Sequence, residues 1–356
     1  MKNKLNVWKI TFLLLLMVAT IFIIRNNYEN VQNKKESSIE LNVTNKSNGY
    51  TKLEGRVFGT KCTIIYNSDK DYSEEIEDVL LGVDFSLSPF NRNSVITAIN
   101  ENKSSMTDEM FVEVFTLAQN ISKNTDGAFD ITVAPLVNAW GFGFKNNIPV
   151  DSASVDSLRE IVDYRKVRIE GGKVVKADQR IMLDCSAIAK GYGSDMVANE
   201  LERLNIKEYM VEIGGEVVAK GVNPNGTVWN IGINKSIDDR SGENGELQGI
   251  VQLNDRGMAT SGNYRNYRIV NGKKYAHTID PRSGYPVEHS LLSATVIAEN
   301  CATADAYATS FMVMGVDKAM EICNSDSTIE GYFIYADENG EMKECMSNGF
   351  GNYLIK

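Results

Sequence analysis

The sequence has little of what most often crosslinks a fold or carries out proton transfer. Its 356 residues include two histidines and five cysteines, and no two cysteines have the CxxC spacing. An odd number of scattered cysteines does not build a disulfide scaffold. We expect most of them to behave as small buried hydrophobic residues. One disulfide remains an alternative, and the sequence does not assign its two cysteines. They are Cys62, Cys185, Cys301, Cys323 and Cys345.

The chain also lacks an excess of positive charge. Its formal net charge is -10 at pH 7, which excludes a nucleic-acid surface as the main function, so we expect no nucleic-acid partner. An acidic chain still binds an anionic ligand where a metal ion, backbone N–H groups and a few local cations meet the anion. The folded part contains no internal repeat and no low-complexity tract.

One long hydrophobic run stands at the N-terminus. Three lysines precede an apolar segment from Ile10 to Ile24, and Arg25 closes it. The pattern predicts a membrane anchor or signal at residues 1–25. No small-x-small cleavage site follows, which favours an uncleaved anchor over a signal peptide. In both cases the body lies outside the cytoplasm, and we expect it on the periplasmic side of the cell inner membrane.

The remaining chain divides into a linker and a folded domain. Residues 26–50 are rich in Asn, Lys, Ser and Glu and predict a flexible linker, and the domain is expected at 51–356. Helical periodicity recurs at 73–85, at 110–121 and up to Leu204, and short β-branched runs with Gly and Asn turns favour antiparallel sheet, hence an α+β fold. Strands are predicted at 55–66, 181–184, 211–215, 229–233, 249–253, 266–270, 293–298, 329–335 and 353–355, with a hairpin at 167–176.

A glycine-containing turn from Cys185 to Gly193 joins a predicted strand to a predicted helix and contains Lys190. Many chains use a strand, a glycine turn and a helix to present backbone N–H groups to an anion. The spacing matches neither the Walker phosphate loop nor the GxGxxG dinucleotide motif. A solvated lysine at a helix start therefore stays open beside the phosphate-binding interpretation.

Two later stretches combine groups suited to chemistry. Asp305 and Thr309 are four residues apart in a predicted helix, so their oxygens share one face and suit a hard cation such as Mg²⁺. A hydrogen bond inside the helix is the alternative. His277 lies in a polar loop with Asp280 and Arg282, which suits proton transfer beside a phosphate. A packed or surface histidine is the alternative there.

Taken together, the motifs of this chain resemble those of the ApbE family of flavin transferases. The resemblance covers essentially the whole chain from about Gly55, and it rests on an ordered set of motifs, each of them weak alone. They are Phe58–Thr60, Leu87–Phe90 with Ser94 and Asn100, Asp126–Asp130 with Pro135–Leu136, Trp140–Gly143, Asp184–Gly191, Gly214–Gly215, Thr260–Tyr264, His277–Gly284, and Ala304–Asp305 with Thr309.

This resemblance implies a two-lobed α+β fold, with mostly antiparallel sheets flanked by helices and an FAD cleft between the lobes. It implies Mg²⁺ held by the Ala187 carbonyl, Asp305 and Thr309 together with the FAD pyrophosphate. Phe58 stands where many members have Met, which alters stacking on the flavin, and Cys185-Ser186 replaces the commoner Leu-Gly. The implied FAD-binding residues are Phe58, Phe90, Ala128, Phe129, Asp130, Asp184, Lys190, Thr278 and Ile279.

The implied reaction is Mg²⁺-dependent transfer of FMN from FAD to a Thr or Ser hydroxyl of an acceptor protein, through a phosphoester bond and with release of AMP. His277 takes the hydroxyl proton, and Arg282 orients the loop or a phosphate. The implied partners are FAD and a redox protein at the outer face of the membrane. An FAD pyrophosphatase, giving FMN and AMP, stays open. A non-catalytic flavin-binding protein is the third interpretation, against which His277, Asp305 and Thr309 all argue.

Overall fold

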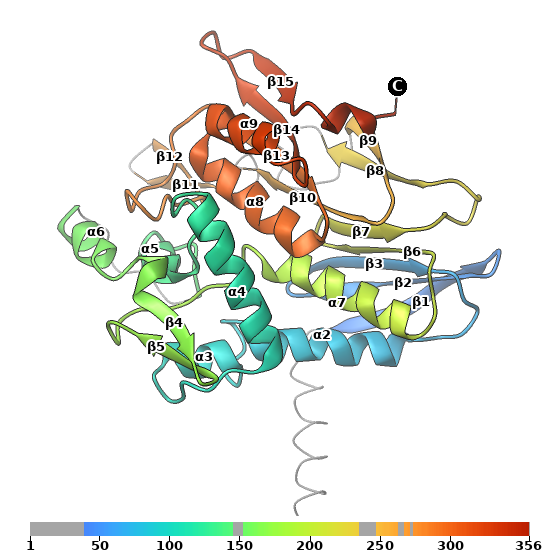
Figure 1. Cartoon of the computed structure of the whole chain (residues 1–356), viewed down its shortest axis with the longest axis horizontal. Coiled ribbons are helices and arrows are strands. Elements are labelled where there is room, and N and C mark those ends of the chain that lie inside the picture. Colours follow the sequence, from blue (N-terminus) through green and yellow to red (C-terminus); the bar gives the residue numbers. More distant parts are fainter. Residues whose placement is uncertain (1–38, 145–151, 235–246, 263–266, 271–272, 356) are drawn as a thin grey trace, which may run out of the picture.

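A large antiparallel sheet organises the molecule. The computed structural model describes residues 39–144, 152–234, 247–262, 267–270 and 273–355, so the predicted anchor lies outside the described residues. Within them, nine strands form one sheet in the order β1-β2-β3-β6-β7-β10-β13-β14-β15, and every neighbouring pair is antiparallel. This confirms the α+β class with antiparallel sheet (Figure 1).

The strands are β1 (Glu40–Ser47), β2 (Tyr50–Val57), β3 (Thr60–Tyr66), β4 (Val167–Glu170), β5 (Lys173–Lys176), β6 (Tyr209–Ile213), β7 (Glu216–Lys220), β8 (Trp229–Asn234), β9 (Leu247–Leu253), β10 (Arg256–Gly262), β11 (Tyr267–Val270), β12 (Lys273–Ala276), β13 (Leu291–Ala298), β14 (Glu330–Ala336) and β15 (Met342–Met346). Three two-stranded ribbons, β4-β5, β8-β9 and β11-β12, stand beside the large sheet.

The helices are α2 (Ser73–Leu87), α3 (Val95–Asn100), α4 (Glu109–Asn124), α5 (Ala134–Ala139), α6 (Ser152–Arg159), α7 (Ala189–Arg203), α8 (Cys301–Met314) and α9 (Val316–Ser325), with short 3-10 turns η1 (Ile131–Val133), η2 (Tyr164–Lys166) and η3 (Phe350–Asn352). Side-chain caps begin several of them. Asp108 accepts from the Phe111 N–H at 2.8 Å to start α4, and Asn300 accepts from the Thr303 N–H at 2.8 Å to start α8.

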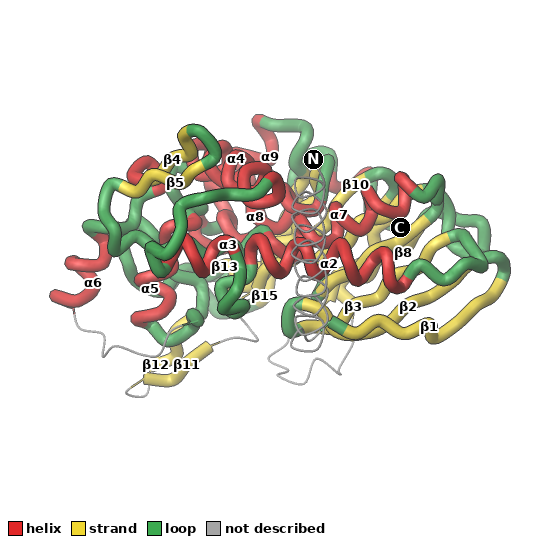
Figure 2. The backbone as a smooth tube through the Cα atoms, turned by 90° about the horizontal axis from the view of Figure 1, so that it is seen from below, coloured by secondary structure: helices red, strands yellow, loops and turns green. Residues whose placement is uncertain are grey.

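Hydrophobic clusters on both faces fix the layers. On one face, α2 and α7 cover β1, β2, β3 and β6 through buried residues such as Leu80 and Leu201. On the other, the β8-β9 ribbon and η3 cover the middle and C-terminal strands through Trp229 and Phe350. In Figure 2, β1 to β3 lie at one end of the molecule and α5, α6 and the β11-β12 ribbon at the other, which agrees with the implied two lobes.

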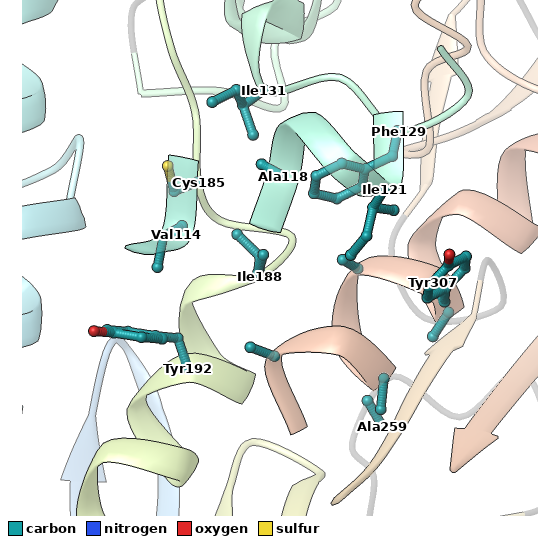
Figure 3. Packing of buried hydrophobic residues seen from close by; sticks show 14 of the residues in the cluster. Val114, Ala118, Ile121, Phe129, Ile131, Cys185, Ile188, Tyr192, Ala259 and Tyr307 are labelled. Carbon is teal, nitrogen blue, oxygen red and sulfur yellow. The ribbon is translucent and has the colours of Figure 1, made fainter. Parts of the chain in front are cut away.

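A third cluster joins α4, α8 and the loops between them. Phe129 packs beside Ala118 and Ile121 of α4 (Figure 3), and Ile188 lies in the same cluster from the segment before α7. Because α4 and α8 share this core with residues 128–131 and 181–188, the loops of the predicted site are held against regular helices. Burial of this apolar surface stabilises their placement by roughly 25 cal/mol per Å² removed from water.

Three local predictions are wrong. The segment 55–66 is two strands, β2 and β3, because the chain turns at Phe58–Gly59, where both residues have positive φ. Residues 181–184 form no strand, although the Asp184 N–H donates to the Ile131 carbonyl at 2.7 Å. Residues 353–355 likewise form no strand, and Leu354 makes only an isolated bridge with Val251. The first segment hid a turn, and at 181–184 the apolar pattern reflected burial, which loops share with strands. The residues at 353–355 are half-buried or exposed.

The predicted linker is too long at its C-terminal end. Residues 40–47 form β1, which pairs with β2 along its length from Glu40↔Arg56 to Ser47↔Tyr50. Most of β1 is exposed, with Leu41 buried, so its polar composition is that of an edge strand that packs one side chain. The folded domain therefore begins by Glu40 rather than near Thr51.

The five cysteines are all free thiols, and four of them are buried, as the prediction of small buried hydrophobic residues required. Burial raises the pKa of Cys62 and of Cys323 to about 12. No helix within the described ranges has the length and apolarity needed to cross a membrane.

Candidate active site

Lys190, in the first turn of α7, lies between two carboxylates. Its Nζ is 3.0 Å from Glu216 Oε1 and 3.5 Å from Asp305 Oδ2. Burial alone would lower the pKa of Lys190, but the charges of Asp305 and Glu216 outweigh it, and the pKa is raised. Burial raises the pKa of Glu216 in turn, with Lys190 opposing the shift. Lys190 is therefore a held cation, which excludes the solvated helix-start lysine.

Asp305 and Thr309 occupy one face of α8, as their spacing predicts. Asp305 is 2% exposed, and its Oδ2 also accepts the Gly191 N–H at 3.1 Å. Thr309 Oγ1 lies 3.2 Å from Ser261 Oγ on β10. The two side chains thus have partners on α7 and on the sheet, respectively.

The donor set fits a hard divalent cation. If α7 began two residues earlier, the Gly191 N–H would donate to the Ala187 carbonyl. It donates to Asp305 instead, so the hydrogen bonds of α7 leave the Ala187 carbonyl unused. Glu216 Oε2 is buried and accepts no hydrogen bond from the described residues. Two carboxylates face one ammonium, which leaves negative charge for a cation. Clusters of three or more His, Cys, Asp or Glu arranged for a metal do not occur in the described part of the chain.

The loop after α4 is built around Asp130. Asp130 Oδ1 accepts from the Thr132 N–H and Oγ1, both at 2.7 Å, and Oδ2 accepts from the Tyr164 N–H at 2.7 Å. Burial raises the pKa of Asp130 to about 6, although these hydrogen bonds oppose the shift. Its carboxylate therefore serves the loop itself, and what this segment can offer a ligand comes from the neighbouring Ala128 and Phe129.

Asp184 stands next to that loop. Its Oδ1 accepts the Ser186 N–H at 2.8 Å, and burial raises the pKa of its carboxyl. The Asp184 N–H bonds the Ile131 carbonyl, so the segments 128–131 and 184–190 are neighbours in space. The predicted FAD-contacting residues of these two segments are thus brought together.

The loop 277–286 closes on itself. Arg282 donates from Nε and from a terminal nitrogen to the two oxygens of Asp280, each at 2.9 Å, and these hydrogen bonds raise the pKa of Arg282. The Arg282 carbonyl accepts from Arg159 of α6, and the Trp140 indole donates to the Gly284 carbonyl at 2.9 Å. The loop is therefore anchored on α5 and α6.

Within this loop Thr278 and Ile279 are buried, and Ile279 packs on α5 and α6. His277 is half-buried, and its ring meets Phe142 edge-on at 6.4 Å between centroids. His277 begins a loop that is anchored on α5 and α6, which agrees with a defined orientation of its imidazole ring. The other histidine, His289, is exposed as a residue, and partial desolvation of its ring beside α8 lowers its pKa.

The two predicted flavin-facing aromatic residues differ. Phe58 packs against α7, because a Cβ at Gly193 would come within 2.7 Å of its ring. Phe58 therefore lies one turn from Lys190. Phe90 is 69% exposed and meets only the edge of Phe144, at 6.1 Å between centroids. It stands at the surface, on the segment between α2 and α3.

Sequence reasoning missed three residues of this region. Glu216 and Ser261 belong to motifs that the resemblance includes or adjoins, but the sequence assigned them no role. Asp195, on α7, accepts the Cys301 and Ala302 N–H groups at 2.8 Å and so caps α8 from outside. Only Glu216 carried a signal, an acid directly after a double glycine in an otherwise apolar strand.

A cavity of about 310 Å³ lies elsewhere, between α4, α7 and β7. None of the predicted site residues lines it. It is surrounded by acids such as Glu113, Asp195 and Asp255, with Arg256 among them. The cavity shares Asp195 with the region described above, but none of the residues predicted for the chemistry.

The fold is α+β, and α7, α8 and β7 bring together a buried charged cluster of Lys190, Asp305 and Glu216. Comparison with known proteins then identifies the family. Residues 58–333 match the ApbE family, and the chain belongs to this family.

Relatives agree over most of the chain. It is 37% identical to the FAD:protein FMN transferase of Haemophilus influenzae, over 87% of this chain and 93% of the relative, and 36% identical to that of Vibrio cholerae, over 85% and 92%. Among solved structures it is similar to the flavin transferase ApbE from Vibrio cholerae, with a TM-score of 0.77, 33% identity, and coverage of 86% of this chain and 99% of that one.

Proposed function

We propose that this protein is an FAD:protein FMN transferase. It moves FMN from FAD to a Thr or Ser hydroxyl of an acceptor protein and releases AMP. The observation that carries the proposal is the similarity over 87% of the chain to a protein of that name. The geometry supports it, because Lys190 of α7 lies 3.5 Å from Asp305 of α8, and Thr309 follows Asp305 by one turn of the same helix.

Asp305, Thr309 and the Ala187 carbonyl would hold Mg²⁺. When bound, the ion supplies charge neutralisation for the pyrophosphate of FAD and for the leaving AMP. Mg²⁺ prefers oxygen ligands, which a carboxylate, a hydroxyl and a backbone carbonyl all supply, and the substrate phosphates would complete its coordination shell. Lys190 adds a second positive charge beside the same phosphates.

His277 is the proposed general base. It takes the proton from the acceptor hydroxyl as that oxygen attacks the FMN phosphorus. A phosphorus–oxygen bond to the acceptor forms, the bond from that phosphorus to the bridging oxygen of the pyrophosphate breaks, and the electron pair leaves with AMP. Arg282 keeps the loop in shape through Asp280, so that the His277 ring faces the reacting atoms.

FAD contacts are proposed for the loops around this cluster. Thr278 and Ile279 supply them from one side, and Ala128, Phe129 and Asp184 from the other. Asp130 contributes through its backbone, because its carboxylate is already engaged. Phe58 would stack on the flavin, and the exposed Phe90 would close over it.

The N-terminal segment 1–25 is proposed to anchor the protein in the cell inner membrane, with the domain on the periplasmic side. Its acceptor would be a redox protein that carries a Thr or Ser flavinylation motif. The support is the lysine-flanked hydrophobic run in the sequence. Digestion of intact spheroplasts with a protease tests this: a domain that survives while a periplasmic marker is cut would contradict it.

The decisive experiment mixes the full chain, FAD, Mg²⁺ and an acceptor with an exposed Ser/Thr-containing motif. The acceptor is run on a denaturing gel and viewed for flavin fluorescence, while AMP is measured in parallel. We expect a fluorescent acceptor band that requires Mg²⁺, with one AMP for each flavin transferred. AMP and free FMN without a band, across several acceptors, would instead make the protein an FAD pyrophosphatase.

A further inference from the structure

Glu216 is the one member of the charged cluster for which the proposed reaction has no use. It is the first residue of β7, and its side chain is 4% exposed. Oε1 pairs with Lys190 Nζ at 3.0 Å, and Oε2 receives no hydrogen bond from the described residues. A buried carboxylate oxygen that accepts no hydrogen bond lowers the stability of the folded state, so its presence needs an explanation.

The backbone fixes this carboxylate in place. Gly214 and Gly215 turn from β6 into β7 with φ of +68° and +107°, which other residues rarely adopt. A Cβ at Gly214 would come within 2.7 Å of Thr60 and 3.3 Å of Glu216 Oε2. Ser194 of α7 donates to the Glu216 carbonyl at 3.2 Å. The turn and α7 thus hold Glu216 at a set distance from Lys190.

The charges of the cluster do not balance. One ammonium is shared by Glu216 at 3.0 Å and Asp305 at 3.5 Å. With Asp305 as its only partner, Lys190 would compete directly with any cation for that carboxylate. With Glu216 present, the nearer partner of Lys190 is Glu216, whose carboxylate the cation does not need.

We propose that Glu216 is a positioning residue that holds the Lys190 ammonium away from Asp305, so that Asp305 is free to bind a divalent cation while Lys190 stays beside the substrate phosphates. The inference rests on the proposed function and deepens it. A cation at Asp305 repels the ammonium, and Glu216 retains it, since unlike charges at this distance in a buried place attract strongly. Glu216 acts through Lys190 and touches neither substrate nor cation.

The test measures cation binding directly. Mn²⁺ is titrated into the full chain with ADP present, whose pyrophosphate stands for that of FAD, and free Mn²⁺ is counted by electron paramagnetic resonance. We expect Glu216→Gln to weaken Mn²⁺ binding about tenfold, equivalent to about 1.4 kcal/mol. Glu216→Asp keeps the charge but draws it back by about 1.5 Å, one carbon–carbon bond, and should weaken binding nearly as much.

A double-mutant cycle shows whether the effect passes through Lys190. In a Lys190→Met background, Glu216→Gln should change Mn²⁺ affinity no further, because no ammonium remains to be held. Glu212→Gln is the matched control: Glu212 accepts the Gly215 N–H at 2.9 Å in the same turn and has no ion pair with Lys190. It should bind Mn²⁺ as the unmodified chain does.

Either of two results would overturn the inference. If Glu216→Asp binds Mn²⁺ as tightly as the unmodified chain, the net charge of this side chain matters and the exact position of its carboxylate does not. Equal losses from Glu216→Gln with and without Lys190 would mean that Glu216 acts independently. If Glu216→Gln lowers the melting temperature, the Mn²⁺ affinity of Glu216→Asp, compared with that of the unmodified chain, decides between these outcomes. Flavin transfer by the unmodified chain is followed throughout, since its absence would remove the proposed function and this inference together.

Discussion

The carboxylates of the loop half and of the helical half of the candidate site are used in different ways. Asp130 and Asp280 use both of their oxygens on groups of the loops around them, through three hydrogen bonds each. Asp305 and Glu216 share a single lysine, and Glu216 keeps one oxygen unused. The loop acids thus use both of their oxygens in hydrogen bonds that hold structure, whereas the acids of the helical half are held mainly by one shared ammonium.

This contrast predicts opposite results for removing an acid in each half. A change in the helical half should remove activity and leave stability nearly intact. A change in the loop half should lower stability first. Four experiments follow from it.

The largest effect is expected for Asp305→Ala. Without its carboxylate, Mg²⁺-dependent AMP release and flavin transfer should fall at least about 1000-fold, because charge on the leaving group loses its main stabilisation. The melting temperature should fall less than in Asp130→Ala, since Lys190 keeps its nearer partner Glu216 and one buried N–H, that of Gly191, loses its acceptor. Asp317→Ala, an exposed acid on α9, is the control. AMP release unchanged in Asp305→Ala would end the assignment of Asp305 to the cation.

A smaller loss of activity is expected for His277→Ala. Transfer should fall about 100-fold, the usual size for loss of a general base, while quenching of FAD fluorescence on binding stays the same. His289→Ala provides a matched control, because it is the only other histidine and lies at the surface. Full flavinylation by His277→Ala would exclude the general-base role and leave the loop with a purely structural task.

In the loop half, Asp130→Ala should act on stability. It leaves the Thr132 and Tyr164 N–H groups without their acceptor, at a cost of about 1–3 kcal/mol for each buried group left unpaired. Chemical denaturation measures this. Asp156→Ala, an exposed acid on α6, should change stability by less than about 0.5 kcal/mol. An Asp130→Ala variant as stable as the unmodified chain would break the contrast between the two halves.

The smallest effect is a dependence of stability on pH. Burial raises the pKa of Asp130 from 3.8 to about 6, so between these values the folded state holds a proton that the unfolded state has lost. The stability contributed by Asp130 is thus complete below about pH 4 and declines as the pH rises through 6, with a slope of at most about 1.4 kcal/mol per pH unit. Asp130→Ala should lack this component, and an identical slope in both proteins would show that Asp130 does not titrate there.

Much of this arrangement was predictable from sequence because it follows from periodicity. The spacing of Asp305 and Thr309 set them on one helix face, and a helix up to Leu204 was expected, although α7 begins at Ala189 rather than after Gly193. The pairing partners were not predictable. Lys190 meets Glu216 across 26 positions and Asp305 across more than a hundred, and only the packing of α7 on the sheet beside α8 brings them together.

The loops were harder because burial and strand formation leave the same apolar trace. Residues 181–184 look like a strand, yet they are an extended segment that bonds Ile131 through one N–H. Edge strand β1 looks like a linker, because it packs one apolar side chain and leaves the remainder to water. The role of Asp130 could not be seen at all, since its partner Tyr164 is 34 positions away in the chain.

The buried thiols bear on where such a protein can work. Four of the five sulfur atoms are enclosed, and burial raises the pKa of each, so the reactive thiolate is scarce. Oxidants and disulfide-exchange enzymes act on thiolates that they can reach. Once the protein is folded, these four thiols should therefore stay reduced in an oxidising environment as well as in a reducing one.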